Sequence, residues 1–313
     1  MATVIDQLAP GSRVAIIRLR SMGDCVLTTP AIRLLKQYRP DLEIAVVVDD
    51  RFRDVYTGNP DIATLLGPSR TALLEWRPRL VLNLHGGTRS AWMTALSFGR
   101  WRAGFRHFVL QPLYNISIPR AQQILGEERT VHTAEHVASA MFHLGVPRTE
   151  IPRARLFAEP PRRATPCCVL HPQATAPEKI WPAENFVLLA KRVREELGLE
   201  PVFLGANDAE LAPFDGFARL SGAPLAEAMS AIHGAALFVG NDSGPAHVAA
   251  AFARPGVVLF GGSDPVVWAP WRCPQLRQIL RTPVASLTVE EVFDALRGQH
   301  ESAPQESNKE VSA

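Results

Sequence analysis

A polar segment near the C-terminal end of the chain has the residue types of an anion-binding turn. The apolar residues 237–240 lead into residues 241–247, Asn-Asp-Ser-Gly-Pro-Ala-His, and an alanine-rich stretch follows. This order of strand, turn and helix start leaves backbone N–H groups and the positive end of a helix dipole facing a phosphate. Asp242 or Ser243 can cap the helix, and Gly244 lets a ligand approach the backbone. The alternative is a well-capped helix in an α/β core.

A carboxylate near the N-terminus stands in a similar position. The apolar residues 14–18 predict a strand, a turn with Ser21 and Gly23 follows, and a helix is predicted over residues 24–35. Open parallel sheets bind their ligands at the carboxyl ends of the strands. Asp24 can therefore act as a general base toward a substrate hydroxyl. Its alternative role is that of a first-turn acid stabilising the helix dipole.

Four segments taken together resemble glycosyltransferase family 9, the ADP-heptose:lipopolysaccharide heptosyltransferases. They are residues 18–30 (RLRSMGDCVLTTP), 171–182 (HPQATAPEKIWP), 240–247 (GNDSGPAH) and 259–270 (LFGGSDPVVWAP), and they span nearly the whole chain. The resemblance implies the GT-B architecture, in which two Rossmann-like α/β domains with parallel sheets face a central cleft. In that arrangement the N-terminal domain holds the acceptor and the C-terminal domain holds the nucleotide sugar.

The resemblance also implies roles for individual residues. Asp24 is the expected general base of an inverting transfer, and a flexible ammonium such as that of Lys179 can reach a phosphate. His247 is expected to orient Asp242 or a phosphate. Ala174 and Pro177 depart from the Ser/Thr-rich segment of the family. The expected donor diphosphate residues are Thr175, Lys179, Asp242, Ser243, Gly244 and His247; the expected nucleoside residues are Asn207 and Glu210, with Asp208 as an alternative; the expected acceptor residues are Arg18, Arg20, Ser21, Gly23 and His85.

The elements that must position these residues alternate between strand and helix, which predicts parallel sheets flanked by helices. A proline- and arginine-rich connector separates two such series. We therefore predict an N-terminal domain over residues 1–158, a linker over 159–166 and a C-terminal domain over 167–298. The polar residues 299–313 lack periodicity and predict a disordered tail.

Composition limits the possible functions. With 313 residues, of which 47% are hydrophobic, the chain is long enough for two compact domains. No apolar run is long enough to span a membrane and no signal peptide is apparent, so a cytoplasmic protein is expected. Residues 1–157 carry 20 Lys and Arg against 13 Asp and Glu. This excess of +7 favours an anionic partner, but no nucleic-acid-binding motif accompanies the arginines.

The expected reaction follows from the resemblance. It implies transfer of a heptose from ADP-heptose, or of another nucleotide sugar, to an anionic glycolipid acceptor at the inner membrane surface. No cofactor is expected, and no metal, because the chain has no Asp-x-Asp pair and His132 and His136 have no third ligand. A monomer is expected. The alternatives are transfer of another sugar to a different polysaccharide and a catalytically silent carbohydrate-binding protein. A dinucleotide-dependent oxidoreductase is disfavoured because no Gly-x-Gly-x-x-Gly follows the first strand.

Overall fold

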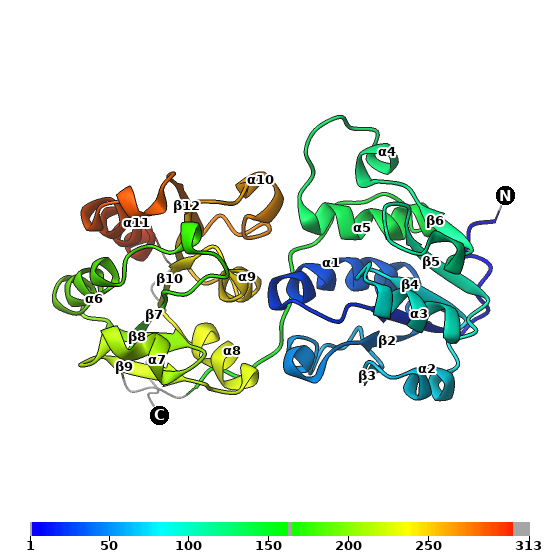
Figure 1. Cartoon of the computed structure of the whole chain (residues 1–313), viewed down its shortest axis with the longest axis horizontal. Helices are drawn as coiled ribbons and strands as arrows, with labels where there is room; N and C mark the ends of the chain where they lie inside the picture. The colour runs from blue at the N-terminus through cyan, green and yellow to red at the C-terminus, as the bar shows by residue number, and fades with distance from the viewer. Residues whose placement is uncertain (1, 162–164, 303–313) are drawn as a thin grey trace, which may run out of the picture.

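The computed structural model describes residues 2–161 and 165–302, which form two parallel six-stranded sheets, one in each half of the chain (Figure 1). The strand orders are β3-β2-β1-β4-β5-β6 and β12-β11-β10-β7-β8-β9. Read from the first strand of each half, both sheets have the 3-2-1-4-5-6 order of a doubly wound nucleotide-binding fold. The predicted α/β class with two Rossmann-like units is confirmed.

The first sheet and its helices occupy the N-terminal half. Its strands are β1 (Arg13–Ile17), β2 (Glu43–Val47), β3 (Thr64–Leu66), β4 (Leu80–Asn83), β5 (Trp101–Phe105) and β6 (Ile116–Ile118); its helices are α1 (Met22–Tyr38), α2 (Arg70–Trp76), α3 (Thr88–Leu96), α4 (Ala121–Leu125) and α5 (Thr133–Leu144), with 3-10 turns η1 (Asp50–Val55) and η2 (Gln111–Leu113).

The second sheet repeats the plan in the C-terminal half. Its strands are β7 (Cys167–His171), β8 (Glu200–Gly205), β9 (Ala218–Ser221), β10 (Leu237–Asn241), β11 (Gly256–Phe260) and β12 (Leu276–Leu280); its helices are α6 (Ala183–Leu197), α7 (Asp208–Leu211), α8 (Leu225–His233), α9 (Gly244–Ala251), α10 (Pro265–Trp268) and α11 (Val289–Ser302), with 3-10 turns η3 (Pro177–Lys179), η4 (Ala212–Phe214) and η5 (Val284–Ser286).

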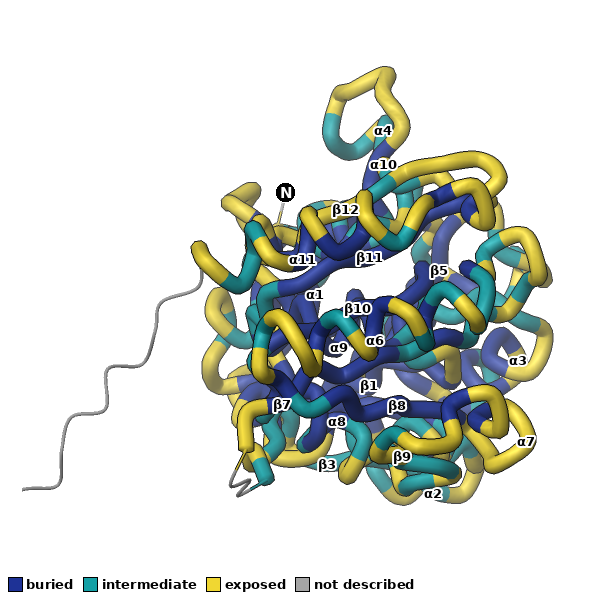
Figure 2. The backbone as a smooth tube through the Cα atoms, turned by 90° about the vertical axis from the view of Figure 1, so that its left-hand side faces the viewer, coloured by how far each residue is buried: buried dark blue, intermediate teal, exposed yellow. Residues whose placement is uncertain are grey.

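The central strands are buried on both faces, which explains their apolar sequences. Every residue of β4, β10 and β11 is buried, and Figure 2 shows β10 and β11 as dark blue tubes. Parallel strands covered by helices on both sides read as continuous hydrophobic runs in this way. The polar residues directly after such strands are consequently held on a rigid base.

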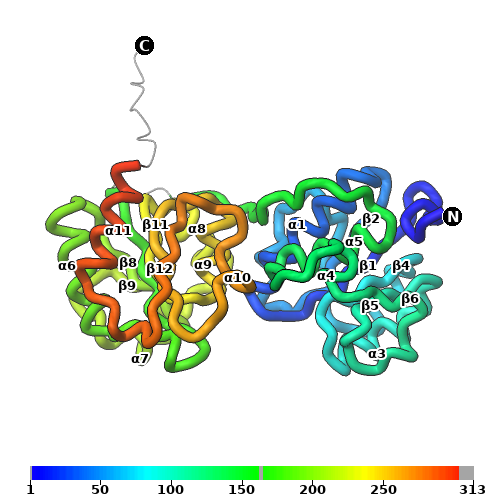
Figure 3. The backbone as a smooth tube through the Cα atoms, turned by 90° about the horizontal axis from the view of Figure 1, so that it is seen from above, coloured from blue at the N-terminus to red at the C-terminus, as the bar shows by residue number. Residues whose placement is uncertain are grey.

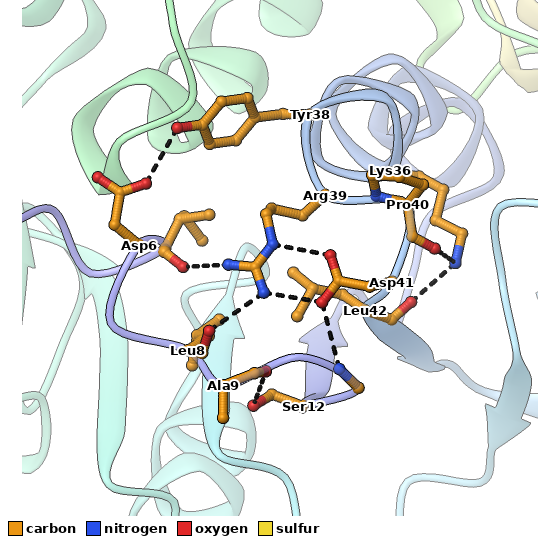
Figure 4. Close-up of polar contacts among 12 residues, drawn as sticks. Asp6, Leu8, Ala9, Ser12, Lys36, Tyr38, Arg39, Pro40, Asp41 and Leu42 are labelled. Atoms are coloured by element: carbon orange, nitrogen blue, oxygen red, sulfur yellow. Dashed lines mark hydrogen bonds and ion pairs between the residues drawn. The ribbon is translucent and has the colours of Figure 1, made fainter.

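The far end of α1 is anchored by a polar network (Figure 4). The guanidinium of Arg39 donates to the carbonyls of Ile5 (2.7 Å) and Leu8 (3.1 Å) and makes two bonds to the Asp41 carboxylate (2.7 and 2.8 Å). Lys36 Nζ donates to two carbonyls beyond the helix, each at 2.8 Å. These cations also complement the negative end of the helix dipole. The network fixes the helix whose opposite end carries Asp24.

The C-terminal boundary differs from the prediction. Helix α11 continues to Ser302, so residues 299–302 are helical and do not belong to a tail. The helix is anchored by Val292, Phe293 and Leu296, which pack into the core of the second domain, and its polar last turn continues from this anchored part. The remainder of the predicted tail, and residues 162–164 of the predicted linker, lie outside the described residues. In the part of the chain that the structure describes, no helix combines the length and apolar character needed to cross a bilayer.

Candidate functional site

The first turns of α1 and α9 meet where the two domains join (Figure 1). A Cβ atom on Gly23 would lie 2.7 Å from Cδ2 of His247, and one on Gly244 would lie 2.9 Å from both Cβ and Sδ of Met22. Only glycine permits this approach at each position. Two helix N-termini therefore direct their positive ends toward the same region, which favours an anion there.

Asp24 lies in the first turn of α1 with a side chain that is 26% exposed. Its carboxylate accepts a hydrogen bond from Ser21 Oγ (3.1 Å) and lies 3.5 Å from a guanidinium nitrogen of Arg18. Arg18 is buried, and its Nε donates to Thr28 Oγ1 at 3.2 Å. Arg18, which we expected to contact an acceptor, therefore contacts Asp24 and Thr28. This arrangement fixes the Asp24 carboxylate and leaves part of it accessible.

His85 follows β4 and lies beside the same arginines. The buried side chain of Asn83 accepts hydrogen bonds from the backbone N–H groups of His85 (2.9 Å) and Gly86 (3.2 Å), so it shapes this turn. Burial, followed by the positive charges of Arg18 and Arg20, lowers the pKa of His85. This environment favours the neutral imidazole. Sequence reasoning overlooked Asn83, although a polar residue ending an apolar strand was a visible signal.

Asp242 is the centre of a buried polar group on the C-terminal domain. Its carboxylate lies 2.9 Å from Lys179 Nζ and accepts a hydrogen bond from Ser263 Oγ. Asp242 is 7% exposed, so the pairing offsets the cost of burying its carboxylate. Lys179 belongs to η3, and the structure therefore brings two residues 63 positions apart into one ion pair. Ser263 was not predicted at the site.

The predicted side-chain cap of α9 is wrong. Ser243 occupies the N-cap position, but its Oγ bonds to His171 Nδ1 (3.0 Å) and to the carbonyl of Asn241 (3.1 Å) and makes no bond to the helix. Asp242 is held by Lys179 and Ser263 instead. No side chain caps α9, so N–H groups of its first turn remain available to a ligand.

His247 is buried between the two domains. Burial lowers its pKa to about 4, so the ring is neutral near pH 7. Its Nδ1 atom has no hydrogen-bond partner among the described residues, and no bond joins it to Asp242. A buried nitrogen without a partner is costly unless a ligand or water satisfies it. His247 lies one helical turn inside α9, and the Cδ2 edge of its ring faces Gly23.

The remaining predicted donor residues lie at the edge of the second sheet. Thr175 is exposed in the loop between β7 and η3. Asn207 caps α7, since its Oδ1 accepts from the N–H of Glu210 (3.0 Å) and its Nδ2 donates to Oε1 of Glu210 (3.1 Å). Asn207 and Glu210 follow the carboxyl end of β8. Their side chains are exposed, and their bonds to each other hold the first turn of α7.

The two histidines that we considered as metal ligands have separate roles. His132 caps α5 through Nδ1, whereas His136 stacks on Phe105 with ring centroids 4.1 Å apart. Across residues 2–161 and 165–302, no three His, Cys, Asp or Glu side chains gather as a metal site. His132 instead bonds to the backbone of the other domain, a contact that the sequence did not indicate.

Comparison with known proteins supports the same fold and family. Residues 72–281 match the family model described as glycosyltransferase family 9 (heptosyltransferase). Lipopolysaccharide heptosyltransferase 3 of Escherichia coli (strain K12) is 26% identical over 304 residues, covering 81% of this chain and 83% of that protein.

Two solved structures share the architecture. The glycosyl transferase family 9 structure from Veillonella parvula has a TM-score of 0.82 at 20% identity, covering 93% of this chain and 98% of that one. The E. coli ADP-heptose lipopolysaccharide heptosyltransferase II has a TM-score of 0.81 at 21% identity, covering 92% and 98%. These likenesses confirm the predicted GT-B fold, and the family match covers most of the chain. The chain belongs to glycosyltransferase family 9, the heptosyltransferase family.

Proposed function

We propose that this protein transfers a heptose from ADP-heptose to an anionic acceptor of the lipopolysaccharide inner core, with inversion at the anomeric carbon and Asp24 as the general base. The observation that carries the proposal is the contact between the first turns of α1 and α9. That contact sets a partly exposed carboxylate opposite an uncapped helix N-terminus. The relatives include an enzyme whose name specifies ADP-heptose as donor.

On the donor side, the diphosphate would bind the first turn of α9. Ser243 and Gly244 offer backbone N–H groups there, and the ammonium of Lys179, which gives one hydrogen bond to Asp242, has two further N–H donors for the diphosphate. Nδ1 of neutral His247, in the tautomer with its proton on Nδ1, would donate its unmet hydrogen bond to the same anion. Charge develops on the diphosphate as the bond to the sugar breaks, and groups fixed beforehand stabilise that charge without reorganisation. Asn207 and Glu210 would contact the nucleoside, and the exposed Thr175 would reach the diphosphate.

On the acceptor side, Asp24 would accept the proton of the attacking hydroxyl. The acceptor oxygen forms its new bond to the anomeric carbon while the bond to ADP breaks on the opposite face. Arg18 holds the carboxylate at 3.5 Å, and Ser21 Oγ holds it at 3.1 Å, so its direction is set before the acceptor binds. Exposed Arg20 and the half-buried His85 lie nearby to receive an anionic acceptor. We propose that the protein meets this acceptor as a monomer at the inner face of the membrane.

The test compares Asp24→Asn with Asp50→Asn. Asparagine preserves the size of the side chain and removes its ability to take a proton, so transfer should fall by about 10²- to 10⁴-fold. ADP binding should be unchanged, because the donor contacts lie on the other domain. Asp50 is an exposed acid of the same domain and its substitution should leave transfer intact. Near-normal turnover of Asp24→Asn would place the base elsewhere.

A further inference from the structure

A segment of the C-terminal domain reaches across to the N-terminal domain directly after α10 (Figures 1 and 3). The carbonyl of Ala269 bonds to His132 Nε2 at 2.7 Å, and Trp271 Nε1 donates to the carbonyl of Pro152 at 3.0 Å. Arg272 donates to the carbonyl of Ile151 at 2.8 Å and pairs with the carboxylate of Glu150. One short segment thus provides several polar contacts between the domains.

The state of the His132 ring follows from its neighbours. Nδ1 accepts a hydrogen bond from the N–H of Ala134 at 3.0 Å, which caps α5 and leaves the ring proton on Nε2. Nε2 therefore donates to the carbonyl of Ala269. The ring also stacks on Trp271, with centroids 4.7 Å apart and planes 29° apart. Serine or asparagine would cap this helix as well, but neither has a second donor long enough to reach Ala269.

Residues 262–272, which include α10 and the contacts above and which we call the donor segment, also contribute to the donor side of the site. Ser263, which precedes α10, bonds to the Asp242 carboxylate. A Cβ on Gly262 would lie 2.5 Å from Cγ of Glu178, so the segment packs directly against the turn that carries Lys179. A shift of the segment away from the N-terminal domain would therefore carry Asp242 and Lys179 with it, away from the domain that holds Asp24.

We propose that His132 and Trp271 form an interdomain latch, in which His132 is a positioning residue that holds the donor segment against the domain carrying Asp24. The inference rests on the proposed transfer reaction. His132 touches no reacting atom in this scheme. It acts through the backbone of Ala269, and it stabilises the arrangement in which the first turns of α1 and α9 are in contact.

The test uses two substitutions at one position. His132→Asn keeps a good helix cap and removes the bond to Ala269, whereas His132→Ala removes both. Because the latch bond is a single neutral hydrogen bond, His132→Asn should lower kcat/KM for the acceptor by about two- to tenfold. Affinity for ADP alone, measured by calorimetry, should stay unchanged. Trp271→Phe keeps the stacking, loses the bond to Pro152 and should show a smaller effect.

A distance measurement separates the latch from the reaction. Spin labels on Glu75→Cys and Glu195→Cys, two exposed positions in different domains, report the interdomain distance distribution. In the labelled protein that keeps His132, the interdomain distance distribution should be narrow when ADP is bound. The additional substitution His132→Asn should broaden that distribution. An unchanged distribution together with unchanged kcat/KM would overturn the latch. If the unsubstituted protein transferred no sugar but the distribution still broadened, the proposed function would fail and the latch would stand.

Discussion

Gly23→Ala tests the contact between α1 and α9 with a single methyl group. The added Cβ would lie 2.7 Å from Cδ2 of His247, about 0.7 Å short of the 3.4 Å at which ordinary contact begins. His247 is 5% exposed and has little room to turn. The two helices must therefore separate or the ring must leave its site. Gly23 does not have a positive φ angle, so the effect is steric and not a consequence of backbone strain.

The size of the effect follows from the cost of overpacking a close contact. Such insertions cost about 1–3 kcal/mol. If this cost destabilises the arrangement in which the first turns of α1 and α9 are in contact, kcat/KM should drop by roughly 5- to 150-fold. Each 1.4 kcal/mol corresponds to a factor of ten. The free energy of unfolding of each domain should change less, because separation of the helices relieves the clash without opening either core.

The assay is ADP release in the presence of acceptor, together with ADP affinity from calorimetry and thermal unfolding. Gly67→Ala is the matched control, because a Cβ there meets no atom within 4 Å and Gly67 has no positive φ. ADP affinity of Gly23→Ala should remain within about threefold if the α9 residues keep their places. Normal kcat/KM for Gly23→Ala would refute the reasoning, since the contact would then have no bearing on transfer.

Three further predictions concern charge. Lys179→Ala should weaken ADP binding by about 10- to 150-fold through loss of a charge-assisted bond, with Lys179→Arg retaining part of the affinity; equal ADP affinity in calorimetry would argue against the contact. Transfer should persist in EDTA, because Lys179 and α9 supply the positive charge, and a loss restored by Mg²⁺ would contradict that assignment. The hydrogen bonds from Arg39 lower the pKa of Asp41 to about 2, below its unfolded value of about 3.9. The contribution of this pair to the free energy of unfolding should therefore be present above about pH 4 and lost between about pH 4 and 2. The free energy of unfolding of Asp41→Asn, measured in urea, should consequently fall less on acidification than that of the unsubstituted protein.

The elements that hold the site were predictable because their signals are strong. β1 and β10 are short apolar runs, each ending in a glycine-containing polar turn that opens a helix. Such runs carry both the burial pattern and the helix start in one continuous segment. For this reason the sequence indicated both the parallel fold and the placing of Asp24 and Ser243 at carboxyl edges.

Edge strands and the end of the chain were less predictable. β6 has only three residues and β9 only four. In β12, Arg277, Gln278 and Leu280 are exposed. Such short and half-exposed strands lack the continuous apolar pattern of the central ones. Helix α11 ends in polar residues, so its last turn resembled a tail even though its apolar face packs on the core.

Contacts between distant residues could not be predicted from spacing. His132 and Ala269 are 137 positions apart, and their bond depends on how the two domains meet. The side-chain bonds of Ser243 likewise depend on His171 in a neighbouring strand, which is why the expected cap of α9 was wrong. Tertiary packing overrode the local preference of serine for capping in this case.

The most direct test is the reaction of the purified protein with ADP-heptose and a heptose-free inner-core acceptor, followed by NMR of the product. We predict one ADP released per sugar transferred, and an anomeric configuration in the product opposite to that in the donor. Transfer with retained configuration would contradict the direct displacement assigned to Asp24. Absence of transfer from ADP-heptose, with turnover of a UDP- or GDP-linked sugar, would contradict the proposed donor.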